Sequence, residues 1–64
     1  MIVEFLGKNV EFDEVVDEFD SHGPYCTEVE VHGSDGNGVE YSAIGYSVGE
    51  DVTEIHKGTI EVLD

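Results

Sequence analysis

The chain has 64 residues, with 16 Asp and Glu against two Lys, and its formal net charge is -14. A chain this short forms one domain at most, with a small core and marginal stability. The charge excludes nucleic acid and anionic membrane surfaces as direct partners, which leaves cations and basic protein surfaces. Its single cysteine, Cys26, excludes an internal disulfide and fits a reducing, cytoplasmic setting.

The first 12 residues predict a β-hairpin. Residues 1–6 are rich in β-branched and aromatic side chains, residues 7–9 supply a turn, and residues 10–12 alternate as a second short strand. The apolar start is too short for a signal peptide and is interrupted by Glu4. No apolar run in the chain approaches the length that spans a membrane.

From Phe12 onward the apolar pattern changes to helical spacing. Apolar residues recur at i, i+3, i+4 and i+7, which predicts one face of an amphipathic helix that begins after Asp13 and ends at residues 22–24. The opposite face of this helix is entirely acidic, and its residues are Asp13, Glu14, Asp17, Glu18 and Asp20.

A second hairpin is predicted in the middle of the chain. Residues 25–32 alternate, with Val29 and Val31 on one side and Glu28 and Glu30 on the other. Residues 33–38 form a turn, and residues 39–48 form a longer strand. Its apolar residues change sides near Gly45, which predicts a β-bulge at that glycine.

The last segment has two interpretations. Residues 52–55 and 59–63 read as two strands joined by residues 56–58, whereas residues 50–57 also fit a short helix. We favour the hairpin because Val, Thr and Ile prefer strands. The predicted fold is therefore α+β: an antiparallel β-sheet with one short amphipathic helix packed on one face, in the order ββα followed by a β-meander. The expected core is Val3, Phe5, Phe12, Val15, Val16, Phe19, Val29, Val31, Ile44, Ile60 and Val62.

The sequence gives little support for a metal site. Residues 35–38 resemble the start of a calcium loop, but the required glycine at the sixth position is replaced by Glu40. Asn37-Gly38 between two strands is instead a hairpin signal. The three histidines and Cys26 match no zinc spacing. We expect no metal and no other cofactor.

Enzyme activity is not expected either. Nucleophilic catalysis needs a side chain placed beside a base, and a glycosidase-like carboxylate pair needs a cleft. A chain of 64 residues leaves little room for such a cleft. No glycine-rich phosphate loop follows a strand and opens a helix.

The carboxylates themselves are the remaining signal. Acids on one face of a strand repeat every ~6.6–6.8 Å, close to two axial steps of ~3.4 Å between phosphates on one DNA strand. Acids on one helix face lie ~5–6 Å apart. A rigid array at such spacings imitates nucleic-acid phosphates. The carboxylates predicted to contact a partner in this way are Asp13, Glu14, Asp17, Glu18, Asp20, Glu28, Glu30 and Glu40.

In size, in its lack of Arg and in its acidic elements, the chain resembles the small acidic DNA-mimic inhibitors of phages and mobile elements, and among these the anti-CRISPR proteins. This resemblance implies an inhibitor that acts in the host cytoplasm as a monomer or small homo-oligomer. Its implied partner is a basic nucleic-acid-binding protein, such as a CRISPR-Cas effector subunit or a restriction complex. The alternatives are a small acidic structural or interaction module without inhibitory activity, and a halophile-adapted domain.

Overall fold

The computed structural model describes residues 1–21 and 26–63, and in these ranges every regular element is a β-strand. The five strands form one antiparallel sheet in the order β1-β2-β3-β4-β5, so each strand pairs with its neighbours in the sequence. The predicted α+β fold with a packed helix is therefore wrong, and the protein is all-β. The strands are β1 (Ile2–Phe5), β2 (Lys8–Ser21), β3 (Thr27–Ser34), β4 (Glu40–Val48) and β5 (Asp51–Leu63).

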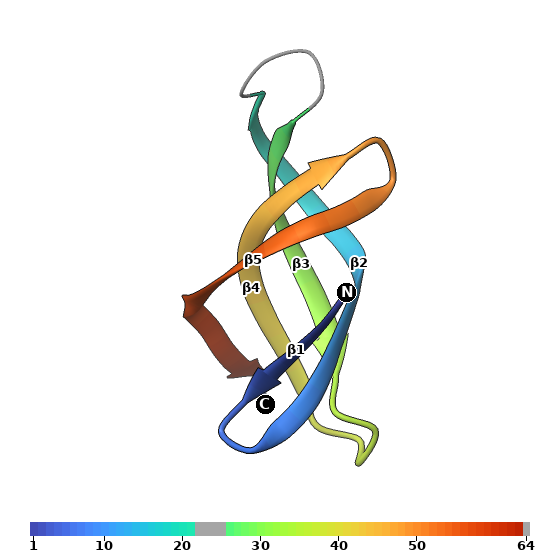
Figure 1. Ribbon diagram of the computed structural model, residues 1–64, viewed down its shortest axis with the longest axis vertical. Helices are drawn as coiled ribbons and strands as arrows, with labels where there is room; N and C mark the ends of the chain where they lie inside the picture. Colours follow the sequence, from blue (N-terminus) through green and yellow to red (C-terminus); the bar gives the residue numbers. More distant parts are fainter. Residues whose placement is uncertain (22–25, 64) are drawn as a thin grey trace.

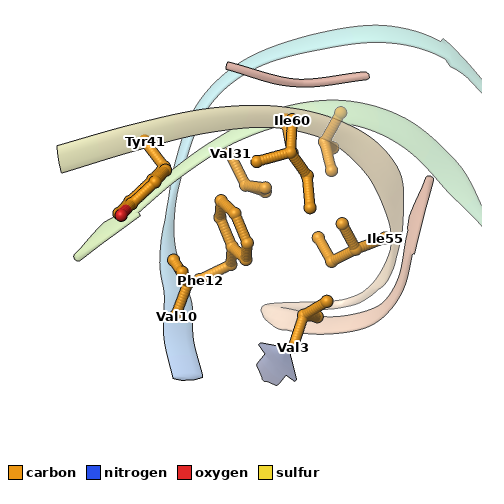
Figure 2. Close-up of a cluster of buried hydrophobic side chains, with 9 residues drawn as sticks. Val3, Val10, Phe12, Val31, Tyr41, Ile55 and Ile60 are labelled. Atoms are coloured by element: carbon orange, nitrogen blue, oxygen red, sulfur yellow. The ribbon is translucent and has the colours of Figure 1, made fainter. Parts of the chain in front are cut away.

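The sheet curves so strongly that its two ends fold over one face. In Figure 1, β1 and β5 pass in front of the central strands β2, β3 and β4. Figure 2 shows the result, with Val3 of β1 and Ile55 and Ile60 of β5 pointing into the same cluster as Phe12 and Val31. We call the covered side of the sheet the inner face and the opposite side the outer face.

Nine buried side chains form the core on the inner face: Val3, Val10, Phe12, Val29, Val31, Tyr41, Ala43, Ile55 and Ile60. The sequence correctly predicted five of them, which are Val3, Phe12, Val29, Val31 and Ile60. Phe5 packs against the cluster and is partly buried. The other predicted core residues were wrong, because they are exposed or only half-buried: Val15, Val16, Phe19, Ile44 and Val62.

The predicted helix is the second part of β2. Three β-bulges interrupt its pairing with β3, and each adds one residue to β2. The β2 residues that lie opposite inner-face residues of β3 therefore recur every third position, at Phe12, Val15 and Glu18, whose partners are Gly33, Val31 and Val29. This period of three lies close to the helical period of 3.6, which explains the wrong prediction.

Local preferences also favour the strand. In a helix the five acids of this segment would crowd one face and repel one another at i, i+3 and i+4. In β2 they are divided between two faces and the bulges. Val and Phe prefer strands, and pairing with β3 satisfies the backbone groups of the segment. Figure 1 shows this part of β2 running beside β3.

β4 alternates without interruption, so the predicted bulge at Gly45 was wrong. Tyr41, Ala43, Gly45 and Ser47 are all buried, and their partners in β3 follow in regular register. Gly45 is required for another reason. A Cβ atom there would overlap the backbone carbonyl of Glu54 on β5, so only glycine lets the two strands approach this closely.

β5 is one strand of 13 residues, which overturns both the predicted hairpin at residues 56–58 and the alternative helix at residues 50–57. Its register against β4 shifts between Ile44 and Ser42, where residues 57–60 of β5 lie opposite the single residue Ala43 of β4. The Thr59 hydroxyl fills the gap in the ladder. It accepts a hydrogen bond from the Ile44 amide at 2.8 Å and donates to the His56 carbonyl at 2.6 Å.

Two-residue turns connect the strands of the hairpins at the two ends of the sheet, β1–β2 and β4–β5. Gly49-Glu50 connects β4 to β5 with a positive φ at Gly49 alone, which is the pattern of a type II′ turn. Leu6-Gly7 connects β1 to β2 with φ values of 52° and 78°, the pattern of a type I′ turn. Leu6 is the one non-glycine residue with positive φ in the described part of the chain, and its side chain is largely in solvent.

Gly45→Ala should destabilise the protein by roughly 2–4 kcal/mol, because β4 and β5 must separate to admit the methyl group. Gly58→Ala is the matched control, since a Cβ atom there meets open space. Its stability should stay within about 0.5 kcal/mol of the parent. Urea unfolding followed by circular dichroism measures both changes, and equal effects would contradict the strand crossing at Gly45.

Leu6→Asn should stabilise the protein by roughly 0.5–1 kcal/mol, because asparagine tolerates positive φ better than leucine does. Leu6→Ala is the control, since it removes the same exposed apolar side chain but keeps the strained backbone. Thermal unfolding should show a higher midpoint for Leu6→Asn alone. A gain shared equally by both variants would instead trace the effect to the leucine side chain.

Candidate functional site

A row of carboxylates crosses the outer face of the sheet from β2 to β5. Residues opposite each other in an antiparallel pair share a face, and Val29 and Val31 face the core, so the alternate residues of β3 face outward. The register carries this assignment to the neighbouring strands. The register also places Glu11, which pairs with the N-terminal ammonium group at 2.8 Å, and Asp51 on this side. We define the outer carboxylate face as the remaining acids of these four strands on this side, Glu14, Asp17, Glu28, Glu30, Glu40, Glu54 and Glu61.

Like charges lie directly opposite each other on this face. Asp17 of β2 pairs with Glu30 of β3, and such a pair destabilises a sheet. Partial compensation comes from histidine. His32 Nε2 lies 3.2 Å from Glu30 Oε2, and His56 Nε2 lies 3.9 Å from Glu54 Oε2, each an ion pair only when the imidazole is protonated.

Neither lysine side chain is assigned to the outer carboxylate face by the strand register. Lys8 Nζ lies 3.7 Å from Asp35 Oδ2 at the β3–β4 loop. Lys57 is exposed and lies in the irregular segment of β5. An open hollow of about 370 Å³ marks the middle of the face, between Glu30 and Glu61, with Ile44 and Thr59 also in its lining. The face therefore combines fixed negative charge with a concave centre.

A second acidic feature lies on the inner side, between β2 and the β4–β5 turn. It is an open groove of about 320 Å³, lined by Asp13, Val15, Glu18, Ser47, Gly49 and Glu50. We call it the β2–β4 groove. The bulges of β2 create it, because they place Glu18 opposite inner-facing Val29 rather than on the outer face.

The structure places seven of the eight predicted partner-binding carboxylates in two groups. Asp20 belongs to neither, and is exposed in the irregular end of β2. Five lie on the outer carboxylate face, namely Glu14, Asp17, Glu28, Glu30 and Glu40. Two, Asp13 and Glu18, line the β2–β4 groove. Sequence reasoning missed Glu54, Glu61 and Glu50, whose positions depend on the β4–β5 turn and the register of β5.

Asp35 organises the β3–β4 loop, and its side chain is fully enclosed. Its carboxylate accepts a hydrogen bond from the backbone N–H of Asn37 at 2.8 Å and one from the Tyr41 hydroxyl at 3.0 Å. The Asn37 hydrogen bond is the largest cause of a lowered pKa at Asp35; the Tyr41 bond and the Lys8 charge act in the same direction, against burial. Burial, followed by the bond to Asp35, raises the pKa of Tyr41. The predicted hairpin turn between β3 and β4 is confirmed, and the Asp35 carboxylate stabilises that turn through these hydrogen bonds.

In residues 1–21 and 26–63, no group of three or more His, Cys, Asp or Glu side chains is placed to hold a metal ion. Of the residues considered for zinc, His22 lies outside the described ranges, and Cys26 is half-buried as a free thiol. The described part of the chain also has no helix long and apolar enough to cross a membrane.

Comparisons with protein-family models, with curated proteins and with solved structures find no match to this chain. The case for a function therefore depends on the arrangement of charge in this structure.

Asp35→Asn should lower stability at pH 7, because the amide cannot accept the loop's hydrogen bonds as a charged group does. The pKa of Asp35 is lower in the folded state, so its contribution is complete above the unfolded value near 3.9 and is lost as the pH falls through the folded pKa. The difference from the parent should therefore shrink at low pH. Urea unfolding at pH 7 and pH 3 measures it.

Asp51→Asn is the control for this comparison. Asp51 is exposed, and its side chain has no hydrogen bond or ion pair to any described residue. Its substitution removes the same charge without touching the loop. A pH-independent difference between the Asp35 variant and the parent would contradict the assigned role of the carboxylate.

Proposed function

We propose that this protein is a nucleic-acid mimic that binds a basic DNA-binding groove of a host defence complex, in the manner of an anti-CRISPR inhibitor in the host cytoplasm. The observation that carries the proposal is the outer carboxylate face. Its acids come from four neighbouring strands, and hydrogen-bonded pairing fixes their positions. A basic groove that evolved to hold phosphates presents the complementary charge.

The spacing of the acids supports phosphate mimicry. Neighbouring strands lie ~4.8 Å apart, and outward residues along one strand repeat every ~6.6–6.8 Å. Glu28 and Glu30 of β3 have the second spacing, which matches about two axial steps of ~3.4 Å along a DNA strand. Asp17 faces Glu30 across the shorter spacing. Because the array is built on strands, it does not have to be ordered when it binds.

The charge density supports the same conclusion. The net charge of -14 is spread over 4193 Å², and 4193 divided by 14 gives about one net negative charge per ~300 Å². Close carboxylates such as Asp17 and Glu30 repel each other in the free protein. A basic partner relieves that repulsion when it binds, so part of the binding free energy is already stored in the fold.

Asp17→Lys tests the proposal, because it separates inhibition from stability. The substitution places a cation opposite Glu30, so it should stabilise the fold by roughly 0.2–1 kcal/mol. It should also weaken inhibition by about tenfold, because it replaces an attractive charge in the contact by a repulsive one. The assay is displacement of labelled DNA from purified CRISPR effector and restriction complexes at low salt, measured by fluorescence anisotropy.

Glu4→Lys is the matched control. Glu4 also points to the outer side of the sheet, but it lies on the edge strand β1 opposite Asn9 and is not one of the carboxylates of β2 to β5 that define the outer carboxylate face. Its replacement changes the net charge by the same amount. It should weaken inhibition by less than about threefold. Equal losses in the two variants would mean that net charge alone matters. Failure of the parent protein to displace DNA from any of these complexes at high excess would refute the proposal.

A further inference from the structure

We propose that the β2–β4 groove is a binding site for an arginine side chain of the partner protein. This inference rests on the proposed function for the existence of a basic partner, but it assigns a different surface and a defined ligand. The groove opens on the inner side of the sheet, whereas the outer carboxylate face lies on the opposite side.

Three carboxylates reach the groove from two parts of the chain. Asp13 and Glu18 come from β2, and Glu50 comes from the β4–β5 turn. All three side chains are exposed at its rim. Val15, which keeps 37% of its surface exposed, contributes an apolar wall between Asp13 and Glu18. The groove thus combines an apolar surface with negative charge on both sides.

Ser47 supplies an independent observation. It is the buried polar residue of the described core region, with 5% of its surface exposed, and it lines the groove. Its hydroxyl has no hydrogen bond to any described residue. Every described side-chain nitrogen or oxygen that is closed to solvent does have a partner. Ser47 therefore adds a largely buried hydroxyl group to the lining of the groove, and a hydroxyl oxygen can accept a hydrogen bond from a cationic ligand.

The shape of the groove selects the ligand. Its carboxylates do not converge on a point that can hold a metal ion in the described part of the chain, and its volume of about 320 Å³ exceeds that of an ion. A guanidinium group is planar and spreads five donors over its edges, so it can reach separated acceptors. Its aliphatic stem can pack on an apolar wall such as Val15. The ammonium group of lysine concentrates its charge and donors at one point.

Titration of ¹⁵N-labelled protein with the peptide acetyl-Gly-Arg-Gly-amide at low salt tests this site. The arginine peptide should shift the backbone amides of Val15, Ser47 and Gly49, while the outer-face amides of Glu30 and Ile44 stay in place. The same peptide with citrulline, the neutral isostere of arginine, should cause no shifts at equal concentration. A lysine peptide should bind several-fold more weakly than the arginine peptide.

Two double variants with the same charge change decide whether the groove is the site. Glu18→Gln with Glu50→Gln should weaken binding of the arginine peptide by at least about fivefold. Glu54→Gln with Glu61→Gln, on the outer face, should weaken it by less than about twofold. The dispersion of the amide spectrum shows whether each variant is folded. Both variants are expected to fold, because the removal of two surface acids reduces repulsion between carboxylates in each.

Shifts spread over both faces, or equal weakening in the two double variants, would overturn the inference in favour of general electrostatic attraction. Equal binding of the lysine peptide would overturn the choice of arginine. The DNA-displacement assay separates the two proposals. If the protein displaces DNA but the arginine peptide does not bind in the groove, the arginine site is refuted and the inhibitor function is retained. If the arginine peptide binds specifically in the groove but the protein displaces no DNA, the inhibitor function is refuted and the arginine site is retained.

Discussion

The pairing of β2 with β3 decides which way the acids of these two strands point. Along β3 the ladder advances two residues at a time, whereas the three bulges make β2 advance three. Inner-face positions on β2 therefore fall at Phe12, Val15 and Glu18, and outer-face positions at Glu14 and Asp17. Without the bulges, strict alternation would place Glu14 and Glu18 on the same face. The bulges thus build both the outer carboxylate face and the β2–β4 groove.

The same register explains where sequence reasoning succeeded. β3 pairs with β4 without a shift, so the alternation of Val29 and Val31 with Glu28 and Glu30 predicts their faces correctly. A regular ladder has a period of two that can be read from one strand alone. In β2 the bulges replace this period by three. Local sequence cannot distinguish that pattern from a helix, because the bulges exist only in relation to β3.

The candidate site was partly predictable for a similar reason. Composition alone indicates a surface dominated by carboxylates, and five of the eight predicted residues do share the outer face. The remaining members, Glu54 and Glu61, depend on a strand that the sequence divides at residues 56–58. The Thr59 hydroxyl keeps that strand continuous by bonding to the ladder in place of the backbone. A side chain that substitutes for a backbone partner has no local sequence signal.

The stability of the protein and its proposed activity act against each other at these positions. Phe12, Val29 and Val31 are fully buried and hold the central strands together, while acids on the outer face of the same strands repel. A domain of this size has little stability to spare. The charge pattern is therefore understandable as a binding surface whose internal repulsion is offset by the buried core. The register of β2 and β3 fixes both the core residues and the acids on these strands.

Nuclear Overhauser effects along β2 test this register most directly. The structure predicts contacts across the sheet between the backbone protons of Val15 and Val31 and between those of Glu18 and Val29. Contacts between residues i and i+3 from Asp13 to Asp20, without these long-range pairs, would indicate a helix. That result would remove both the outer carboxylate face and the groove, and it would contradict the account.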